Sequence, residues 1–571
     1  MKIKLTYAPA INAIVLTFPY DPELTQKAKD LGGRAVYKEK KFIRWQIEFT
    51  PEAESLMLDH KDDPAYEIAE SVYFAFETAR EIKAKNYELS ISDSADIKVN
   101  AFLDPVLKGY QKAGVEYICN NSSGVLLADE MGLGKTLQAL ASIERMSYYP
   151  ALILCPAVVK YNWLRECEKW LPHRRAALVE SYKDDVKGTG PAEIYIINYD
   201  ILQKYWGLLD SGIWKVLICD ESHFLKNHKA DRTIRVQKLA EGIPHKILMT
   251  GTPVLNRPKE LLSQLMILGK LDSIGGFWHF VETYCQKKET KFGMDINGAA
   301  NLEDLNKRMR ESCYVRREKK EVLKELPPKN RIPQWIKIDN GPEYEKAESD
   351  VIEYLKENAR VEAEFIESIK DRPETEQASL IADYRESVAR RAARAEAIVK
   401  INVLKQIVAR GKLKAAQAWI KNYFEESDSK LVIFAWHTEI IETLCKEFEC
   451  ESITGDTSPE DRDRIVYDFQ NKKDCKTLVC NIQAGGVGIT LTAANTSLFL
   501  ELGWNPGTMD QAEDRIHRIG QMDSATIFYM LGEGTIDRAN WEMIEHKRRV
   551  VGDASDGFIQ VREWMINRSR R

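Results

Sequence analysis

Few features that mark specialised protein classes occur in this sequence. The ten cysteines are scattered, with no C-x-x-C pair and no histidine cluster at zinc-ligand spacing, which argues against a structural metal site and favours a reducing compartment. No apolar run approaches the length of a membrane span, and no low-complexity tract is present. A soluble, intracellular globular protein is therefore expected.

The chain also lacks an excess of positive charge. Its formal net charge is −5, from 82 basic and 87 acidic side chains, which excludes a uniformly basic protein that coats nucleic acid. The N-terminal stretch MKIKLTYAPAINAIVLTF is interrupted by polar residues and has no small-residue cleavage site after it, so no secretion signal is expected. A length of 571 residues predicts roughly three or four compact units.

Residues 1–95 are predicted to form a small α+β module. Ile43, Trp45, Ile47 and Phe49 alternate with polar residues, which is the period of a half-buried strand. A helix is expected before it, from Pro22 to Leu31, ended by two glycines.

Two larger α/β lobes are predicted, at 96–339 and 413–536. Short runs rich in Val, Ile and Leu alternate there with helical patterns, which indicates parallel sheets covered on both faces. The runs are Val125–Ala128, Leu152–Cys155, Ile194–Ile197, Val216–Cys219 and Ile247–Met249 in the first lobe, and Leu431–Ala435, Thr477–Ile482 and Ser497–Leu500 in the second.

Residues from about 340 to 427 are dense in Glu, Lys, Arg and Ala and contain few Pro or Gly. This composition favours long exposed helices, and we assign 340–412 to an inserted helical unit. A solvated coiled-coil spacer is the alternative, and the sequence hardly separates the two. Residues 537–571 form a C-terminal segment that includes HKRRVV and a terminal RSRR, which is either part of a brace or a loose basic tail.

The stretch GVLLADEMGLGKT has the strand, loop and helix context of a phosphate-binding loop. Gly132 and Gly134 let backbone amides approach phosphate oxygens, Lys135 would reach the β- and γ-phosphates, and the Thr136 hydroxyl would bind Mg²⁺. Asp129 stands where the general pattern has a glycine. A helix that starts at Gly-Lys-Thr without any ligand is the alternative.

Two further elements suit phosphate chemistry. After the strand VLIC, Asp220 would hold the Mg²⁺ and Glu221 would orient or deprotonate the attacking water. In QAEDRIHRIGQ, Arg515 and Arg518 lie three residues apart, so both are predicted to project from one helical face and to neutralise charge on a transferring phosphoryl group. Taken singly, the acidic pair could be a solvated loop and the arginines a solvated helix face.

In order, the motifs LKGYQKAGVEYI, DEMGLGKT, DESHFLKN, LMTGTP, YVRREKKEVLKELPPK, AGGVGITLTAAN and LELGWNPGTMDQAEDRIHRIGQ resemble those of the Swi/Snf type of superfamily-two DNA-dependent ATPase, from about 102 to 550. DEMGLGKT is this family's usual form, which accounts for Asp129. The resemblance implies two RecA-like lobes, ATP and Mg²⁺ as cofactors, and translocation on duplex DNA without strand separation. It also implies a set of nucleotide-binding residues: Gln111 at the adenine edge, Asp129, Glu130, Met131, Gly132, Leu133, Gly134 and Thr136 in the loop, and Gly486, Gly488 and Gln511 in the second lobe.

The resemblance also suggests DNA contacts through the phosphate backbone, which track DNA without reading its sequence. Thr250, Gly251 and Thr252 would link the nucleotide state to these contacts. Plain turns are the alternative at the glycines, a core aromatic at Trp504, and solvated loops elsewhere. The candidate contacts are Lys160, Asn162, Trp163, Lys226, Asn227, Thr250, Thr252, His437, Thr454, Gly455, Trp504 and Asn505.

The segment FGMDINGAANL and the N-terminal LGGRAVYKEKKFIRWQIEF resemble the branch of the family that contains fork-remodelling annealing helicases, whose N-terminal module is called HARP. Lys38 and Trp45 are the DNA-contact candidates there, because basic and aromatic residues together suit phosphates and exposed bases. The alternative is a small hairpin with Trp45 in its core.

The leading hypothesis is an ATP-driven motor that remodels or reanneals branched DNA in replication, recombination or repair. A remodeller that displaces proteins from duplex DNA and a noncatalytic DNA-binding scaffold are the alternatives, and the scaffold is disfavoured by the complete set of phosphate-handling residues. Double-stranded or branched DNA is the expected partner, a membrane is not, and a monomer is expected. Compact size favours the cytoplasm of a bacterial or phage-infected cell, with the nucleus as the location in a eukaryote.

Overall fold

The chain divides into two compact units, Met1–Glu289 with Gly293–Leu323 and Thr290–Phe292 with Lys324–Arg571. A computed structural model describes residues 3–9, 13–18, 20–31, 33–38, 41–47, 49, 51–121, 123–179, 192–251, 258–286, 288–290, 293–296, 298–323, 325–373, 376–377, 380–381, 384, 387–486, 488–549 and 564–565.

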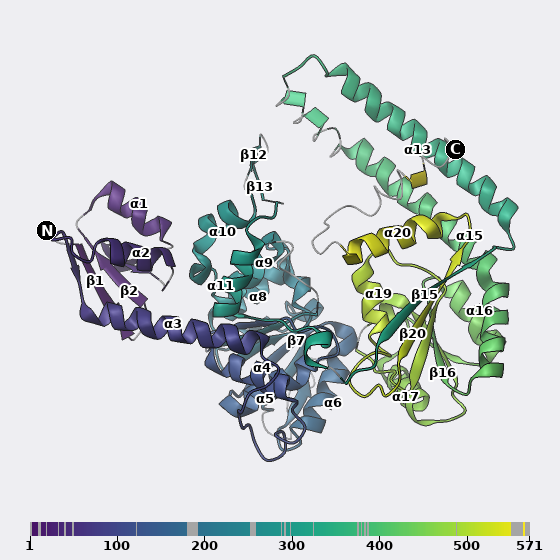
Figure 1. The fold of residues 1–571 in the computed structure, drawn as a ribbon, viewed down its shortest axis with the longest axis horizontal. Coiled ribbons are helices and arrows are strands. Elements are labelled where there is room, and N and C mark those ends of the chain that lie inside the picture. Colours follow the sequence, from purple (N-terminus) through teal and green to yellow (C-terminus); the bar gives the residue numbers. More distant parts are fainter. Residues whose placement is uncertain are drawn as a thin grey trace. The chain divides into compact units, whose positions relative to one another are not determined.

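The first unit begins with a small α+β module (Figure 1). Its five-stranded sheet has the order β3-β4-β2-β1-β5. The elements are β1 (Ile3–Ala8), β2 (Ala13–Thr17), α1 (Pro22–Asp30), β3 (Arg34–Lys38), β4 (Lys41–Ile47), α2 (Pro51–Asp59) and β5 (Tyr66–Ile68). Helix α1 starts where predicted because the Asp21 carboxylate accepts from the Leu24 amide at 2.9 Å and Pro22 occupies the first turn.

Helix α3 (Glu70–Ile91) leads from this module to the first large sheet (Figure 1). Near its end, the Asn86 side chain donates to the Glu311 carbonyl at 3.0 Å. A second link joins Arg308 to the Glu52 carboxylate of α2 at 2.7 Å. The module is therefore attached to the rest of its unit by polar contacts as well as by the chain.

A seven-stranded parallel sheet forms the centre of the first unit, in the order β14-β6-β11-β10-β7-β9-β8. Four of its central strands are buried along their whole length, and all of their residues except Asn198 at the end of β9 are apolar or aromatic, which confirms the predicted doubly covered sheet. The strands are β6 (Val125–Leu127), β7 (Ala151–Cys155), β8 (Ala176–Leu178), β9 (Ile194–Asn198), β10 (Val216–Cys219), β11 (His245–Met249) and β14 (Tyr314–Val315).

Helices connect these strands and complete the unit. The longer ones are α4 (Gly109–Asn120), α5 (Lys135–Met146), α6 (Lys160–Trp170), α8 (Asp231–Glu241), α9 (Pro258–Leu268), α10 (Gly276–Tyr284) and α11 (Leu302–Ser312), and shorter ones are α7 (Trp206–Leu209) and α12 (Lys319–Val322). A short hairpin pairs β12 (Lys288–Thr290) with β13 (Gly293–Asp295). One continuous core runs from Leu126 to Tyr314 through these elements.

The second unit contains a six-stranded parallel sheet in the order β15-β20-β19-β16-β18-β17. Its strands are β15 (Lys329–Ile336), β16 (Lys430–Ala435), β17 (Glu451–Ile453), β18 (Thr477–Asn481), β19 (Ala494–Phe499) and β20 (Ala525–Gly532). Its shorter helices are α16 (Thr438–Phe448), α17 (Pro459–Asn471), α18 (Ile482–Gly485), α19 (Pro506–Glu513) and α20 (Ile536–Arg549). Strand β15 was predicted in the first lobe, but its ladder with β20 places it in the second.

Two long helices, α13 (Gly341–Ser368) and α15 (Val388–Glu426), form the predicted helical unit and pack on each other (Figure 1). The boundary expected at residue 412 falls inside α15. This helix continues because its last third is apolar on one side, with Ala416 and Ile420 in a core shared with β16. Composition detected the helix but not the point at which it joins the sheet.

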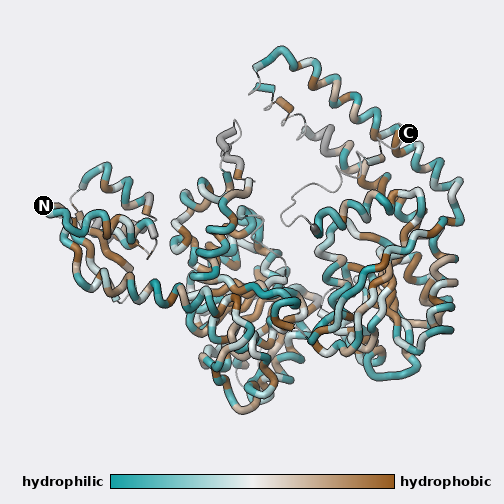
Figure 2. Tube along the Cα trace, viewed as in Figure 1, coloured by the Kyte–Doolittle hydropathy of each residue, from teal (hydrophilic) through white to brown (hydrophobic). Residues whose placement is uncertain are grey.

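Figure 2 shows apolar residues concentrated in the sheet strands and polar residues along much of α13 and α15. Across the part of the chain that the structure describes, no helix has the length and apolar character needed to cross a membrane.

A buried ion pair attaches α15 to the second sheet. Lys412 Nζ lies 2.7 Å from Asp537 Oδ2 and also donates to the carbonyl of Met530 at 2.9 Å, and both side chains of the pair are almost fully buried. Asp537 in turn accepts from the Gly532 amide at 3.0 Å. The pair therefore joins α15, β20 and α20.

We predict that Lys412→Met destabilises the second unit by about 3–5 kcal/mol, because it leaves a buried carboxylate without its counter-charge. Urea unfolding followed by tryptophan fluorescence, with hydrogen exchange on α15, measures the change. The matched control is Lys414→Met, since Lys414 is 83% exposed and its loss is expected to cost less than about 0.5 kcal/mol. Equal effects of the two substitutions would contradict the prediction.

Candidate active site

The predicted phosphate loop lies between β6 and α5. Gly132 and Gly134 adopt left-handed backbone angles, with φ of 82° and 73°, which side chains other than glycine rarely adopt. A Cβ on Gly134 would also lie 2.4 Å from the Gln111 side chain. The helix that follows begins at Lys135, so its first amides face the loop, as an anion site requires.

Lys135 crosses back over the loop. Its Nζ donates to the Asp129 carbonyl at 2.7 Å. Burial lowers the pKa of Lys135, while the negative charges of Glu221, Asp129 and Asp220 oppose that shift. The ammonium thus faces acidic groups in a place poor in water, where a phosphate would be a strong partner.

The acidic pair, Asp220 and Glu221, directly follows β10. This strand lies beside β11, and the TGTP motif follows β11. Asp220 accepts from the Trp163 indole at 2.8 Å and from the Glu221 amide at 2.9 Å. Burial, and then the charge of Glu221, raises the pKa of Asp220 to about 6. Glu221 has φ of 48°, a strained angle for this residue type, and strain of this kind is concentrated at functional sites.

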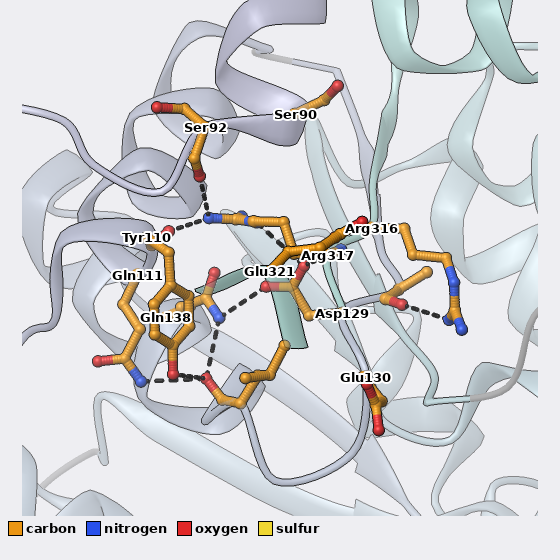
Figure 3. Close-up of polar contacts among 12 residues, drawn as sticks. Ser90, Ser92, Tyr110, Gln111, Asp129, Glu130, Gln138, Arg316, Arg317 and Glu321 are labelled. Carbon is orange, nitrogen blue, oxygen red and sulfur yellow. Dashed lines mark hydrogen bonds and ion pairs between the residues drawn. The ribbon is translucent and has the colours of Figure 1, made fainter. Parts of the chain in front are cut away.

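Asp129 has a different role from the one predicted. It was assigned to nucleotide binding, but its carboxylate is fully buried and points away from the loop surface (Figure 3). It accepts from the backbone amide and Nε of Arg317, at 2.9 and 3.2 Å, and from Gln138 at 3.1 Å. These three donors occupy the carboxylate, so it holds the loop from its buried side.

Gln111 also supports the loop. Its side chain is 3% exposed, donates to the Leu133 carbonyl at 3.1 Å and accepts from the Lys108 amide at 2.9 Å. Contact with adenine stays a prediction, since both polar atoms are bound to backbone here. Glu130 accepts from the Lys319 amide at 2.7 Å, Leu133 is buried, and Met131 and Thr136 are half-buried.

The TGTP motif lies beside the loop. The Thr250 amide donates to the Leu127 carbonyl at 3.2 Å and its side chain is buried. A Cβ on Gly251 would meet Met131 at 2.4 Å and lie 3.4 Å from Lys135 Nζ. Gly251 therefore packs closely against the Met131 side chain of the loop, and the link of this motif to the nucleotide state stays a prediction. Thr252 lies outside the described residues.

In the second unit, the expected helical face for the arginines is wrong. Helix α19 ends at Glu513, and Arg515 and Arg518 lie in the turns that follow. The turn still brings them together, because both guanidinium groups donate to the Ile489 carbonyl, at 3.1 and 3.3 Å. Arg518 also donates to Thr490 Oγ1 at 2.9 Å.

The second-unit glycines join the same cluster. Gly488 has φ of 74° and directly precedes Ile489. A Cβ on Gly486 would lie 2.9 Å from the Ile482 carbonyl and 3.8 Å from the Gln511 side chain. The predicted residues Gly486, Gly488, Gln511, Arg515 and Arg518 are therefore gathered at one place.

Glu513, which sequence reasoning missed, holds this turn from behind. It is fully buried and bound to Lys329 and Arg331 at 2.8 and 2.7 Å, to Arg548 at 3.1 Å and to the Tyr529 hydroxyl at 2.6 Å. Burial would raise the pKa of Glu513, but these positive charges hold it well below its usual range. The network joins α19 to β15, β20 and α20 within the second unit, and a brace between the two lobes stays a prediction.

Among the DNA candidates of the first unit, Trp163 is not at the surface. It is 1% exposed, and its indole N–H donates to the Asp220 carboxylate. Lys160 and Asn162 are half-buried near the start of α6. Lys226 and Asn227 are exposed, although Lys226 lies 3.5 Å from Glu260 and Asn227 accepts from the Lys229 amide at 3.0 Å.

The second-unit candidates are held by their own neighbours. The His437 amide donates to Glu501 at 2.9 Å, and its ring also contacts that carboxylate. Trp504 is half-buried, with Lys405 Nζ 4.6 Å from its ring centre.

Two more of these candidates form local hydrogen bonds. The Thr454 amide donates to the Thr457 hydroxyl at 2.9 Å, and Gly455 is exposed. Asn505 caps α19 by accepting from the Gly507 amide at 2.9 Å. Arg462, another residue missed, donates to the Ala484 carbonyl at 3.2 Å and thereby supports the neighbouring loops.

In the N-terminal module, Trp45 is 6% exposed and belongs to the core. Burial leaves little of the indole available for stacking, which favours the structural alternative for this residue. Lys38 lies in β3, but its side chain is outside the described residues.

Taken together, the two parallel-sheet lobes, the glycine loop with its lysine, the acidic pair and the arginine turn define an ATPase of the RecA-like type. Residues 110–370 match the family model of the SNF2-related domain, and residues 411–520 match that of the helicase conserved C-terminal domain. The chain belongs to the Swi/Snf-type DNA-dependent ATPases of helicase superfamily two, near the annealing-helicase branch.

Several curated proteins are similar to this chain. The SWI/SNF-related matrix-associated actin-dependent regulator of chromatin subfamily A-like protein 1 of Xenopus tropicalis is 31% identical, over 80% of this chain and 46% of that protein. Its Caenorhabditis elegans homolog is 33% identical, over 81% and 64%. The DNA annealing helicase and endonuclease ZRANB3 of Homo sapiens is 30% identical, over 78% and 40%. The chain thus spans about half the length of these relatives.

Among solved structures, the Sulfolobus solfataricus SWI2/SNF2 ATPase core in complex with dsDNA is 24% identical with a TM-score of 0.37, over 82% of this chain and 97% of that one.

We predict that Trp163→Phe moves the acidic limb of the ATPase pH profile upward by about one pH unit. The indole N–H stabilises the ionised form of Asp220 and so lowers its pKa. Its removal raises that pKa, and hydrogen bonds to charged groups are worth about 1.5–3 kcal/mol, at 1.36 kcal/mol per unit. Turnover at fixed free Mg²⁺ from pH 5.5 to 8.5 measures the shift. Trp170→Phe is the control, because Trp170 donates to Glu166 on the same helix; superimposable profiles of all three proteins would rule the effect out.

Proposed function

We propose that the protein is an ATP-dependent translocase on double-stranded DNA that remodels or reanneals branched DNA, in replication, recombination or repair. The observation that supports this most is a phosphate loop and acidic pair in one unit together with an arginine turn in the other, within a single chain. The names of the relatives, one of which is a DNA annealing helicase, support the choice of branch.

In this proposal, each group has a chemical task. Lys135 and the loop amides bind the β- and γ-phosphates. Thr136 and Asp220 offer oxygen ligands of the kind that Mg²⁺ prefers, and the ion would neutralise phosphate charge. Glu221 orients the attacking water, and Arg515 and Arg518 stabilise charge on the transferring group.

DNA contact in this proposal comes from local loops, since the net charge is −5. The exposed positions Lys226, Asn227, Gly455 and Asn505 offer backbone or side-chain groups to phosphates. Such contacts follow the strand without reading bases, which suits a motor that must move along any sequence. Trp163 is excluded from this set by its burial.

The first test is ATP turnover with no DNA, single strands, duplex and forked DNA. We expect duplex and fork to stimulate turnover at least tenfold, and Lys135→Ala to abolish it, because the loop loses its main phosphate-binding charge. Lys98→Ala is the control, since Lys98 is exposed and outside the site. A turnover that no DNA changes would exclude a motor.

The second test concerns the fork. Lys38→Ala combined with Lys41→Ala removes two charges from the β3–β4 hairpin and is expected to lower fork-stimulated turnover and reannealing severalfold, with duplex-stimulated turnover unchanged, because duplex contacts lie elsewhere. These substitutions are preferable to deleting residues 1–95, which would remove Asn86 and its bond to the Glu311 carbonyl. If duplex and fork stimulate the turnover of the unaltered protein equally, the proposed action on forks is wrong, and the proposed translocation on duplex DNA stands.

A further inference from the structure

A segment nearly two hundred residues downstream forms one wall of the phosphate loop. The amides of Leu126, Ala128 and Glu130 donate to the carbonyls of Cys313, Val315 and Arg317, at 2.7, 2.7 and 2.9 Å. The ladder of β14 and β6 therefore continues past the strand and into the loop. Whatever fixes residues 313–317 also fixes the first half of the loop.

Arg317 is the side chain at the centre of this wall. Both Arg317 and Asp129 have 0% exposed side chains, and Arg317 Nε lies 3.2 Å from Asp129 Oδ1. The guanidinium also donates to the Tyr110 carbonyl of α4 (Figure 3). A buried carboxylate is tolerated only with a partner of opposite charge and satisfied hydrogen bonds, so Asp129 at this position requires Arg317.

The second half of the loop is held by the same cluster. Three donors converge on the Leu133 carbonyl: the Tyr110 hydroxyl and Gln111 Nε2, each at 3.1 Å, and Gln138 Nε2 at 3.4 Å. Gln138 Nε2 also donates to Asp129 at 3.1 Å and so joins the two ends of the loop. Figure 3 shows Gln138 between Asp129 and Gln111.

A glycine leaves room for this arrangement. Gly114 lies inside α4, where glycine costs about 1 kcal/mol relative to alanine. A Cβ there would lie 1.9 Å from Gln138 Oε1 and 2.8 Å from Arg317 Nη2. The helix thus carries an unfavourable residue at the point where a methyl group would displace the two side chains that hold Asp129.

We propose that Arg317 is a positioning residue for the ATPase reaction: through the buried pair with Asp129 it holds the phosphate loop in the shape that binds nucleotide. Arg317 touches no nucleotide in this scheme and acts only through Asp129 and the loop backbone. The inference rests on the proposed nucleotide site, and it assigns the aspartate that replaces the usual first glycine of the loop to the inner face of the protein.

The test is the binding of mant-ATP to the full chain without DNA. We expect Arg317→Met to weaken binding at least about tenfold, because an uncompensated buried carboxylate distorts the loop. Asp129→Asn combined with Arg317→Met removes both charges and is expected to bind within about threefold of the unaltered protein. At saturating ATP, the turnover of Arg317→Met should recover, whereas that of Lys135→Ala should not, since Lys135 acts on the phosphates themselves.

Gly114→Ala supplies a variant that keeps every charge. It is expected to weaken mant-ATP binding severalfold and also to lower the unfolding midpoint, because the added methyl meets Gln138 and Arg317 in a filled interior and this outweighs the better helix propensity of alanine. Lys320→Met, at a side chain that is 78% exposed, is the control and should bind as the unaltered protein does. DNA affinity without nucleotide, measured by fluorescence anisotropy, should be the same for all variants.

Three results separate the inference from the function on which it rests. If Lys135→Ala binds mant-ATP weakly but Arg317→Met and Gly114→Ala bind it normally, Arg317 does not position the loop, and the nucleotide site stands. If Asp129→Asn and Arg317→Met weaken mant-ATP binding additively when they are combined, the two side chains do not act as a pair, and the inference is likewise overturned. If Lys135→Ala itself binds mant-ATP normally, the nucleotide site is wrong and the proposed function fails with it.

Discussion

The carboxylate of Asp129, buried at the first residue of the phosphate loop, is the constraint on which the first unit depends. A charge without water is stable only beside an opposite charge and hydrogen-bond donors, and Arg317 and Gln138 provide both. Because Arg317 lies two residues after the end of β14, satisfying this charge also fixes the edge strand of the sheet against β6. The loop, the sheet edge and the start of α4 therefore share one set of contacts.

The second unit follows the same physical rule with different residues. Buried Glu513 binds three positive side chains behind the arginine turn, and buried Glu501 holds His437 at the start of α16. In each place an interior carboxylate fixes a stretch of irregular backbone that carries candidate functional groups. Low dielectric makes such contacts strong and their loss costly, which suits loops that must keep their shape while ligands come and go.

Much of the fold could be predicted from residue patterns. Buried parallel strands such as β7 and β16 are unbroken apolar runs, and α1 begins at a capping aspartate followed by proline. The short strands β8, β14 and β17, of two or three residues, carry too little pattern to detect. Strand β15 was placed in the wrong lobe because its exposed, mixed sequence does not reveal its partner, which lies almost two hundred residues away.

For the candidate site, the sequence by itself determined which chemical groups the chain possesses and their order: a glycine loop with Lys135, the carboxylates Asp220 and Glu221, and the arginines Arg515 and Arg518. Only the tertiary structure decided which polar groups face inward. Asp129 pairs with Arg317, the Trp163 indole donates to Asp220, Trp45 lies in a core, and α19 ends before the arginines. The reason is physical: a local pattern reports the type and spacing of side chains, whereas burial and counter-charges depend on partners that are distant in the chain.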